Sequence, residues 1–382
     1  MPPIRRCSVL CDRVIGAGVE RDVDNIEQLQ EDLDDLKNVE DADEDVATTG
    51  ELFSISSFGV DYPVETLVSR MNKKLFYIPP FQRAFVWSQN QCSRFVESLL
   101  LGLPVPGIFL FKEADSGKHL VIDGQQRLKS LLYFSEGLIN GKEFVLTGLE
   151  TRFGNRTYKT LDEADRARLN DAVIHATVFK QDLPEGEINS VYEVFERINT
   201  GGIKLSPQEI RSCICHGNFN DYLHRLNDNA EWRAIYGPKS KRLKDVEIIL
   251  RFMAFYEKGS SYKSPMKHFL NDYMKLKRNL SDVELQALGT IFVKMVSFVT
   301  KALGNRTFRP DRSLNTAVFD SVANALAHRL AVKAEPQIEA ALVAYNALFQ
   351  NERFVEGYIR STADEDNVKK RMEEAEKAFA DI

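Results

Sequence analysis

The run that decides the fold is Leu120-Val-Ile-Asp123-Gly124-Gln125-Gln126-Arg127-Leu128. Three consecutive apolar residues predict a buried strand, and the spacing after them predicts a helix over residues 124–136 that ends at Gly137. Asp123 is a favourable N-cap residue, and Gly124 permits a close approach of the backbone. The run therefore predicts a strand that passes directly into a helix.

Such a strand-to-helix junction is a potential anion site. The first N–H groups of a helix have no partner within it, and they favour phosphate. Arg127 on the same turn could add a guanidinium, while Gln125 and Gln126 could orient water or hold a base or a sugar. The alternative is structural: Asp123 only caps the helix, Gln126 completes a capping box, and Arg127 is solvated. The run does not have the pattern of a P-loop.

Two further runs hold polar side chains among aromatic and glycine residues. Residues 78–87 carry the pair Gln82-Arg83 in a proline-stiffened segment between Phe81 and Trp87. Residues 195–202 end a predicted helix at Asn199, which is followed by two glycines. Each run also has a structural interpretation, a pinned surface loop for the first and an ordinary helix C-terminus for the second.

The pattern along the rest of the chain predicts two kinds of architecture. Short apolar runs at residues 76–78, 108–111 and 174–179 predict strands separated by helices. Beyond residue 243 the spacing of apolar residues is almost purely helical. We therefore expect the α+β class, with a mixed domain over residues 51–235 followed by an all-helical domain over residues 236–382.

Composition and charge exclude several classes of protein. A hydrophobic fraction of 43% excludes a wholly disordered chain. The sequence has no run of about 18 apolar residues, so we expect no transmembrane helix. The five scattered cysteines favour a reducing cytoplasm over a disulfide scaffold. The net charge of −6 is concentrated, because residues 20–45 hold 13 acids and two bases. Residues 1–50 thus read as an acidic, disordered leader, or as a mask for a basic groove.

Taken together, the motifs resemble the N-terminal domain family of GmrSD-type modification-dependent restriction enzymes, a branch of the ParB/sulfiredoxin-like fold. The resemblance rests on four runs, at residues 78–87, 97–106, 122–128 and 195–202, in the expected order and spacing. It implies a ParB/sulfiredoxin-like domain and a role of the Asp-Gly-Gln-Gln-Arg motif in nucleotide binding and hydrolysis. Carried over to this sequence, that assigns Asp123, Gln126 and Arg127 to catalysis. The implied nucleotide-binding residues are Gln82, Arg83, Gly124, Gln125 and Asn199.

The same resemblance identifies a missing part. Full-length members carry a C-terminal His-Asn-His-like nuclease domain, which needs clustered metal ligands. After residue 230 this chain has only His268 and His328, each isolated in a helical pattern. The run Cys213-Ile-Cys215-His216 has no second ligand pair, so we predict no zinc site there and no other metal site. We therefore predict that this chain does not cleave DNA alone.

Two main functions remain open at this point. The first is a nucleotide-binding, NTP-hydrolysing regulator of a restriction or phage-defence system, with Mg²⁺ as a further candidate and a separate nuclease or methyltransferase as partner. The second is a non-catalytic module that binds DNA or a protein, and a ParB-like nuclease is a third. The basic clusters at residues 239–244 and 275–278 give the DNA-binding module some support, although they also fit solvated helix ends. We expect no association with a membrane.

Overall fold

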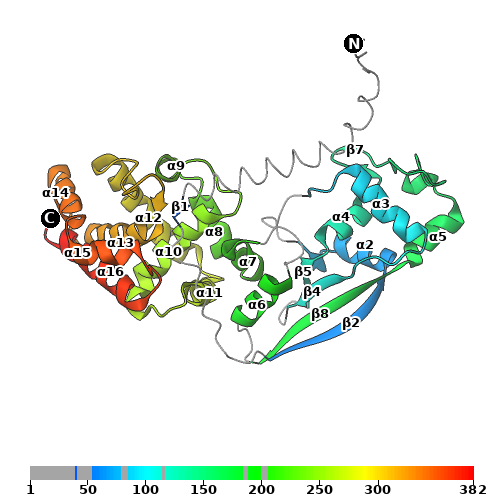
Figure 1. Cartoon of the computed structure of the whole chain (residues 1–382), viewed down its shortest axis with the longest axis horizontal. Coiled ribbons are helices and arrows are strands. Elements are labelled where there is room, and N and C mark those ends of the chain that lie inside the picture. The colour runs from blue at the N-terminus through cyan, green and yellow to red at the C-terminus, as the bar shows by residue number, and fades with distance from the viewer. Residues whose placement is uncertain (1–38, 41–53, 79–84, 114–116, 184–187, 199–204) are drawn as a thin grey trace, which may run out of the picture. The chain divides into compact units, whose positions relative to one another are not determined.

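The computed structural model describes residues 39–40, 54–78, 85–113, 117–183, 188–198 and 205–382. Within them the chain divides into two compact units. We call residues 54–223 together with 267–281 the N-terminal unit. Residues 39–40, 224–266 and 282–382 form the helical unit. The expected combination of a small sheet with helices, followed by a helix-rich C-terminal part, is confirmed (Figure 1).

The N-terminal unit is built on a five-stranded mixed sheet with the strand order β2-β8-β4-β5-β3. Strands β2 and β8 are antiparallel, as are β4 and β5, whereas β8 with β4 and β5 with β3 are parallel pairs. The strands are β2 (Ser54–Pro63), β3 (Phe76–Tyr77), β4 (Ile108–Lys112), β5 (His119–Asp123) and β8 (Val173–Leu183), with a separate small hairpin of β6 (Leu138–Ile139) and β7 (Lys142–Glu143).

Helices cover both faces of this sheet, because its strands carry apolar side chains on each side. On one face Val121 and Leu110 pack with residues of α2, α3, α4 and α5, and on the other face Leu120 and Ile122 pack with α6 and α7. The helices are α2 (Val64–Asn72), α3 (Gln89–Leu100), α4 (Gln125–Glu136), η1 (Tyr158–Thr160), α5 (Glu163–Asp171), α6 (Ile188–Ile198), α7 (Pro207–Ile214), α8 (Asn218–Leu226) and α11 (Met266–Lys277).

Helix α11 groups with the N-terminal unit, although it lies far along the chain. Its Asn271 accepts a hydrogen bond of 2.9 Å from Arg211 of α7, and both side chains are buried. Just beyond α11, Arg278 donates to the backbone oxygen of His216 at 2.9 Å. Such contacts between residues about 60 positions apart are not visible in local sequence patterns. The predicted domain limits at residues 50, 235 and 236 stay predictions.

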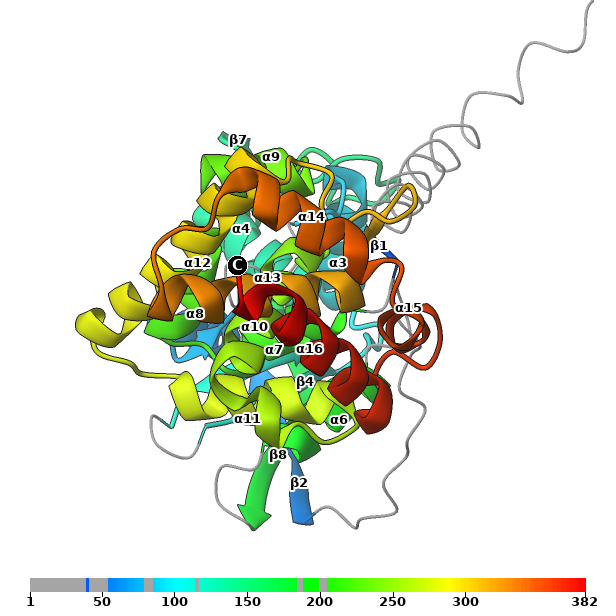
Figure 2. The same cartoon turned by 90° about the vertical axis from the view of Figure 1, so that its left-hand side faces the viewer.

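The helical unit is organised around α13, whose residues are almost all buried. Figure 2 shows α13 among the other helices of this unit. Helices α10, α12 and α16 pack against it. The unit also contains a two-residue parallel pair in which Val39–Glu40 (β1) lies beside Leu314–Asn315 (β9), so it is not purely helical. Its helices are α9 (Ala230–Tyr236), α10 (Lys244–Lys258), η3 (Gly259–Ser261), α12 (Asp282–Ala302), α13 (Thr316–Val332), α14 (Ile338–Leu348), α15 (Glu352–Ile359) and α16 (Glu365–Ala380).

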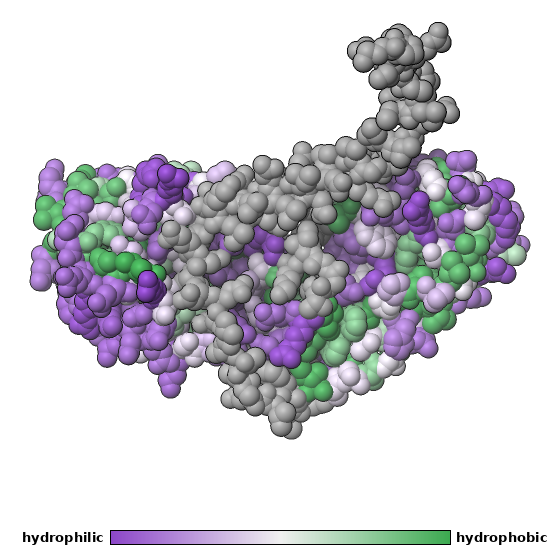
Figure 3. Space-filling view, viewed as in Figure 1, coloured by the Kyte–Doolittle hydropathy of each residue, from purple (hydrophilic) through white to green (hydrophobic). Residues whose placement is uncertain are grey.

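One helix of the described chain, α12, has the length and apolar composition that could span a bilayer. The buried core helix of a globular unit passes the same test, and Phe292, Met295 and Val296 of α12 are fully buried within this structure. Hydrophilic residues predominate on the face of the helical unit shown in Figure 3. The length and composition of α12 are therefore weak evidence for a membrane segment.

Candidate functional site

The predicted strand-to-helix junction is present. Strand β5 is a central strand whose residues Leu120, Val121 and Ile122 are at most 1% exposed, and α4 follows it after a single residue. The helix ends at Gly137, as expected. The prediction that Asp123 is the N-cap is wrong, because Gly124 occupies that position and no side chain caps the helix start.

Gly124 takes the N-cap position because only glycine fits there. Its φ of 99° lies in the left-handed region, which disfavours residues with a Cβ atom. A Cβ atom at this residue would also lie 2.4 Å from Cγ2 of Ile108, at the start of β4. The expected close backbone approach at Gly124 is therefore confirmed, and the neighbour is Ile108.

The displaced Asp123 side chain forms an ion pair with Arg127. Nη2 of Arg127 lies 2.6 Å from Oδ2 of Asp123, one helical turn away. The Arg127 side chain is 15% exposed and its Nε is buried without a hydrogen-bond partner, while the Asp123 side chain is 45% exposed. Arg127 is thus not a solvated side chain. It is held at the junction by a carboxylate that water can reach.

Gln126 connects this junction to the second motif. Its Oε1 atom accepts hydrogen bonds from the backbone N–H groups of Val86 (3.1 Å) and Trp87 (3.3 Å). It does not complete a capping box with Asp123. Gln125 is buried at 7% exposure. No sequence pattern indicated the role of Val86 and Trp87, because backbone N–H groups are common to almost every residue.

The second motif and the strand before it lie against β5 and α4. Before it, Tyr77 of β3 pairs with Leu120 of β5. Within it, the ring of Phe85 meets Tyr133 of α4 edge to face, with centroids 5.1 Å apart. Gln82 and Arg83 themselves lie outside the described residues, so their predicted contacts with the nucleotide stay predictions.

The third motif approaches β5 from the other face of the sheet. Phe195 of α6 is completely buried and packs in one cluster with Leu120 and Ile122. The described part of this run ends at Ile198, and Asn199 lies outside the described residues. The structure therefore brings the described parts of all three motifs to β5, although the second and third motifs are more than 100 residues apart in the sequence.

The cysteine and histidine residues considered as metal ligands have other surroundings in the structure. Cys213 and Cys215 are buried, and burial raises the pKa of both thiols, which keeps them protonated. His328 donates toward Glu376 with 3.4 Å between Nδ1 and Oε1, and its Nε2 lies 3.2 Å from the backbone oxygen of Tyr256. Among the described residues, no three His, Cys, Asp or Glu side chains gather as metal ligands would.

A cavity of about 340 Å³ lies elsewhere in the N-terminal unit, between α2, α4 and α5. Val68, Leu131 and Tyr158 contribute to its wall. The described residues that line it include none of the predicted site residues. Sequence patterns gave no sign of this cavity, because its wall comes from helix faces that read as ordinary core.

The motifs and the junction together identify the domain. Residues 64–215 match the family model of the GmrSD restriction endonuclease, N-terminal domain. The resemblance inferred from the motifs is thus confirmed for this segment, which runs from the first residue of α2 to the residue after α7. No curated protein matches the chain. The GmrSD match suggests a component of a restriction or phage-defence system.

Proposed function

We propose that the GmrSD N-terminal segment binds a nucleoside triphosphate at the start of α4 and hydrolyses it, as the regulatory component of a restriction or phage-defence system. The observation that carries this proposal is the junction itself: an uncapped helix start at Gly124, beside an Arg127 guanidinium that Asp123 holds in place. Helix N–H groups and a guanidinium are complementary to phosphate oxygens. The proposal includes the ParB/sulfiredoxin-like classification of the sheet and a cytoplasmic location.

The phosphates would contact the first turn of α4. Because Gly124 has no Cβ atom, the start of the helix can lie directly against Ile108, and Arg127 contributes the positive charge. Gln125 would help to fix the position of this turn because it is buried within it. Gln82, Arg83 and Asn199 would complete the pocket, since the described parts of their motifs adjoin β5 and α4.

For hydrolysis, Asp123 is a better candidate than Gln126 to orient the attacking water. Its carboxylate is 45% exposed, and only Oδ2 forms the ion pair with Arg127. Gln126 acts as a positioning residue, because its oxygen accepts from two backbone N–H groups of the second motif. Asp123 and the nucleotide phosphates together offer the oxygen ligands that Mg²⁺ prefers, and the ion would neutralise phosphate charge. A separate nuclease or methyltransferase is the proposed partner.

The test is phosphate release by the purified full chain across a panel of nucleotides, with and without DNA. We expect turnover with at least one nucleotide, and a loss of at least about 100-fold in Arg127→Ala, because an arginine that stabilises phosphoryl charge is worth that much or more. Arg94→Ala is the matched control, since Arg94 is an exposed arginine on α3 of the same unit. It should retain the wild-type rate.

Gln126→Glu separates folding from chemistry. Glutamate keeps an acceptor oxygen for the N–H groups of Val86 and Trp87 but adds a negative charge where phosphate would bind. We expect a folded protein with strongly reduced nucleotide affinity. Wild-type protein without turnover, but with salt-sensitive DNA binding, would contradict the enzyme and favour the non-catalytic module. Metal-dependent nicking of DNA by this chain alone would favour a ParB-like nuclease.

A further inference from the structure

Strand β2 forms one edge of the sheet in the N-terminal unit (Figure 1). It pairs with β8 along its inner side, over all 10 of its residues. Among the described residues, no backbone hydrogen bond reaches β2 from outside the sheet. The strand precedes the segment that matches the GmrSD model, and it has no part in the proposed nucleotide site. Its outer side is therefore an open row of backbone donors and acceptors.

The features that usually protect an edge strand lie only at the two ends of β2. Natural edge strands resist pairing through charged side chains, proline or a bulge. At one end of β2 the register is irregular between Ser54 and Ile55, and at the other end the strand has Asp61 and Pro63. Residues 56–60 between them hold no charge and no proline. The middle of β2 is thus the part that can accept another strand.

An exposed aromatic residue lies at the centre of this uncharged stretch. The side chain of Phe58 is 45% exposed, although Val178, its partner in β8, is completely buried. Ser57 and Gly59 on either side of it are also exposed. Small residues beside an aromatic ring leave room for a second strand to approach, and the ring gains contact area when that strand covers it.

We propose that two copies of this chain associate through β2, as an antiparallel pair of strands related by a twofold axis at Phe58. In this register the two Phe58 rings lie opposite each other, as a cross-strand aromatic pair. On one face of the pair Ser57 lies opposite Gly59, and on the other face Ser56 lies opposite Val60. Each bulky side chain therefore meets either its own copy or a small residue, so the two edges fit without a steric clash.

The charge of the strand also fits a second copy. Asp61 is the one charged residue of β2, and in this register it lies opposite Ile55 of the other copy. Like charges that oppose each other across two strands destabilise the pair, and none do so here. Asp61 instead keeps its contact with His175 of β8, with 2.8 Å between Oδ1 and Nδ1. The edge is therefore complementary to itself, as a twofold interface requires.

The test is analytical ultracentrifugation of the purified full chain from about 1 to 100 µM, because association through one strand edge depends on concentration. We expect a wild-type dimer that dissociates on dilution. Phe58→Lys should weaken the association at least about tenfold, because it removes the aromatic pair and places two like charges opposite each other. Val173→Lys is the matched control, since Val173 is another exposed apolar residue, at the start of β8. It should associate like the wild type.

Two outcomes of this experiment would overturn the proposal. A wild type that stays monomeric at about 100 µM would exclude the second copy and leave the edge to a strand of another protein. Equal losses of association in Phe58→Lys and Val173→Lys would show that added charge, and not the centre of β2, controls the dimer. Far-ultraviolet circular dichroism of both variants checks that they keep the wild-type fold.

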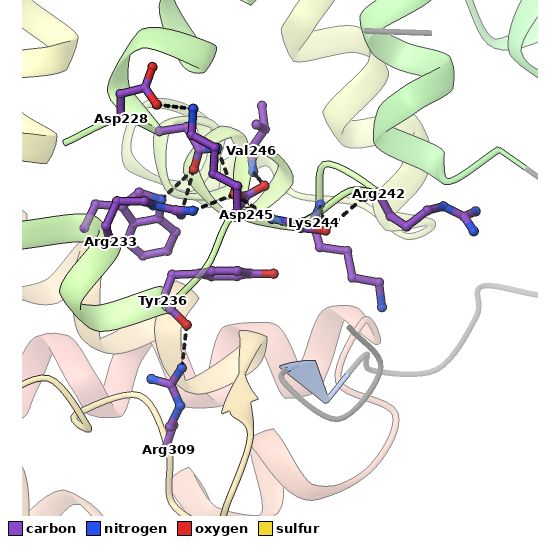
Figure 4. Close-up of polar contacts among 12 residues, drawn as sticks. Asp228, Arg233, Tyr236, Arg242, Lys244, Asp245, Val246 and Arg309 are labelled. Atoms are coloured by element: carbon purple, nitrogen blue, oxygen red, sulfur yellow. Dashed lines mark hydrogen bonds and ion pairs between the residues drawn. The ribbon is translucent and has the colours of Figure 1, made fainter. Parts of the chain in front are cut away.

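Attraction between unlike charges on two copies is the main alternative cause of association. Residues 20–45 hold 13 acids and two bases, whereas residues 239–244 hold four cations and no acid. Figure 4 shows Arg242 and Lys244 of the second segment, followed by the buried Asp245. Salt screens such attraction but has little effect on backbone hydrogen bonds and an aromatic pair. Association that is unchanged from about 50 to 500 mM salt supports pairing through β2, whereas its loss at the higher salt would overturn it.

Disulfide cross-linking tests the register without adding charge. Residues directly opposite each other on antiparallel strands have Cα atoms about 4.5 to 5.5 Å apart, which is within the range of a disulfide. Under mild oxidation Phe58→Cys should form a covalent dimer above the background of the wild type, which has five cysteines of its own. Val173→Cys should stay at that background. A yield of covalent dimer from Phe58→Cys no higher than from Val173→Cys would overturn the twofold register at Phe58.

Discussion

The two units use an aspartate–arginine contact in opposite ways. In the N-terminal unit, Asp123 and Arg127 pair at the end of a strand, where the aspartate side chain is 45% exposed. In the helical unit, Asp320 of α13 is completely buried between Arg251 of α10 and Arg371 of α16. Removal of charge from water is costly, so the buried group must be structural, whereas the exposed pair can change its partner.

The buried cluster is asymmetric. Arg251 makes two contacts with Asp320, at 2.5 and 3.1 Å, whereas Nη2 of Arg371 lies 3.6 Å from Oδ2. Burial opposes the charge of both arginines, but the carboxylate outweighs it only for Arg251, whose pKa is raised. For Arg371 burial dominates and lowers the pKa to about 10. The single carboxylate therefore stabilises two guanidinium groups unequally.

The largest effect should come from Asp320→Ala. It would leave two buried arginines without their carboxylate, and we expect the free energy of unfolding to fall by about 3 to 5 kcal/mol. Urea denaturation followed by circular dichroism would measure it. The control is Glu335→Ala, which removes an exposed ion pair with Lys301 and should cost less than about 1 kcal/mol. Similar losses in both variants would contradict the structural role of the buried cluster.

An intermediate effect should come from Gly124→Ala. Alanine would have to keep the left-handed backbone conformation of Gly124, and its Cβ atom would overlap Ile108. We therefore expect the free energy of unfolding to fall by about 2 to 4 kcal/mol. Gly137→Ala, at the other end of α4, is a matched control. Its φ is +80° with no atom within 4 Å, so only the conformational cost of about 1 to 2 kcal/mol applies. Equal denaturation midpoints for the two variants would refute the close contact.

The smallest effect should come from His328→Gln in the helical unit. A hydrogen bond with Glu376 raises the pKa of His328, against the opposing effect of burial. Because the folded pKa is above the unfolded value of about 6.5, the stabilisation is fully present below that pH. It is lost as the pH rises through the folded pKa.

Thermal unfolding near pH 5.5 and near pH 8.5 would measure this effect. The melting temperature of the wild type should exceed that of His328→Gln by at most a few °C at the lower pH, since both partners are about half exposed. The difference should shrink at the higher pH. Glu376→Gln should lose the same pH dependence, and a difference that grows with pH would show that the sign is wrong.

Local signals predicted much of the N-terminal unit. The strands β4, β5 and β8, and the helix α4 that ends at Gly137, follow from short-range patterns. These signals act within one helical turn or along one strand, so no tertiary contact is needed to recognise them. The motif order also identified the GmrSD domain, which the match over residues 64–215 confirms.

The sequence by itself therefore determined the strand-to-helix junction, the domain family and the concentration of acid in residues 20–45. Only the tertiary structure decided that Gly124 rather than Asp123 caps α4, because that depends on the contact with Ile108 from another strand. It also decided that Asp123 pairs with Arg127. In the basic cluster at residues 239–244, it decided that the backbone N–H of Ser240 donates to the buried Asp245. Each choice depends on burial and on neighbours distant in the sequence, which no local pattern contains.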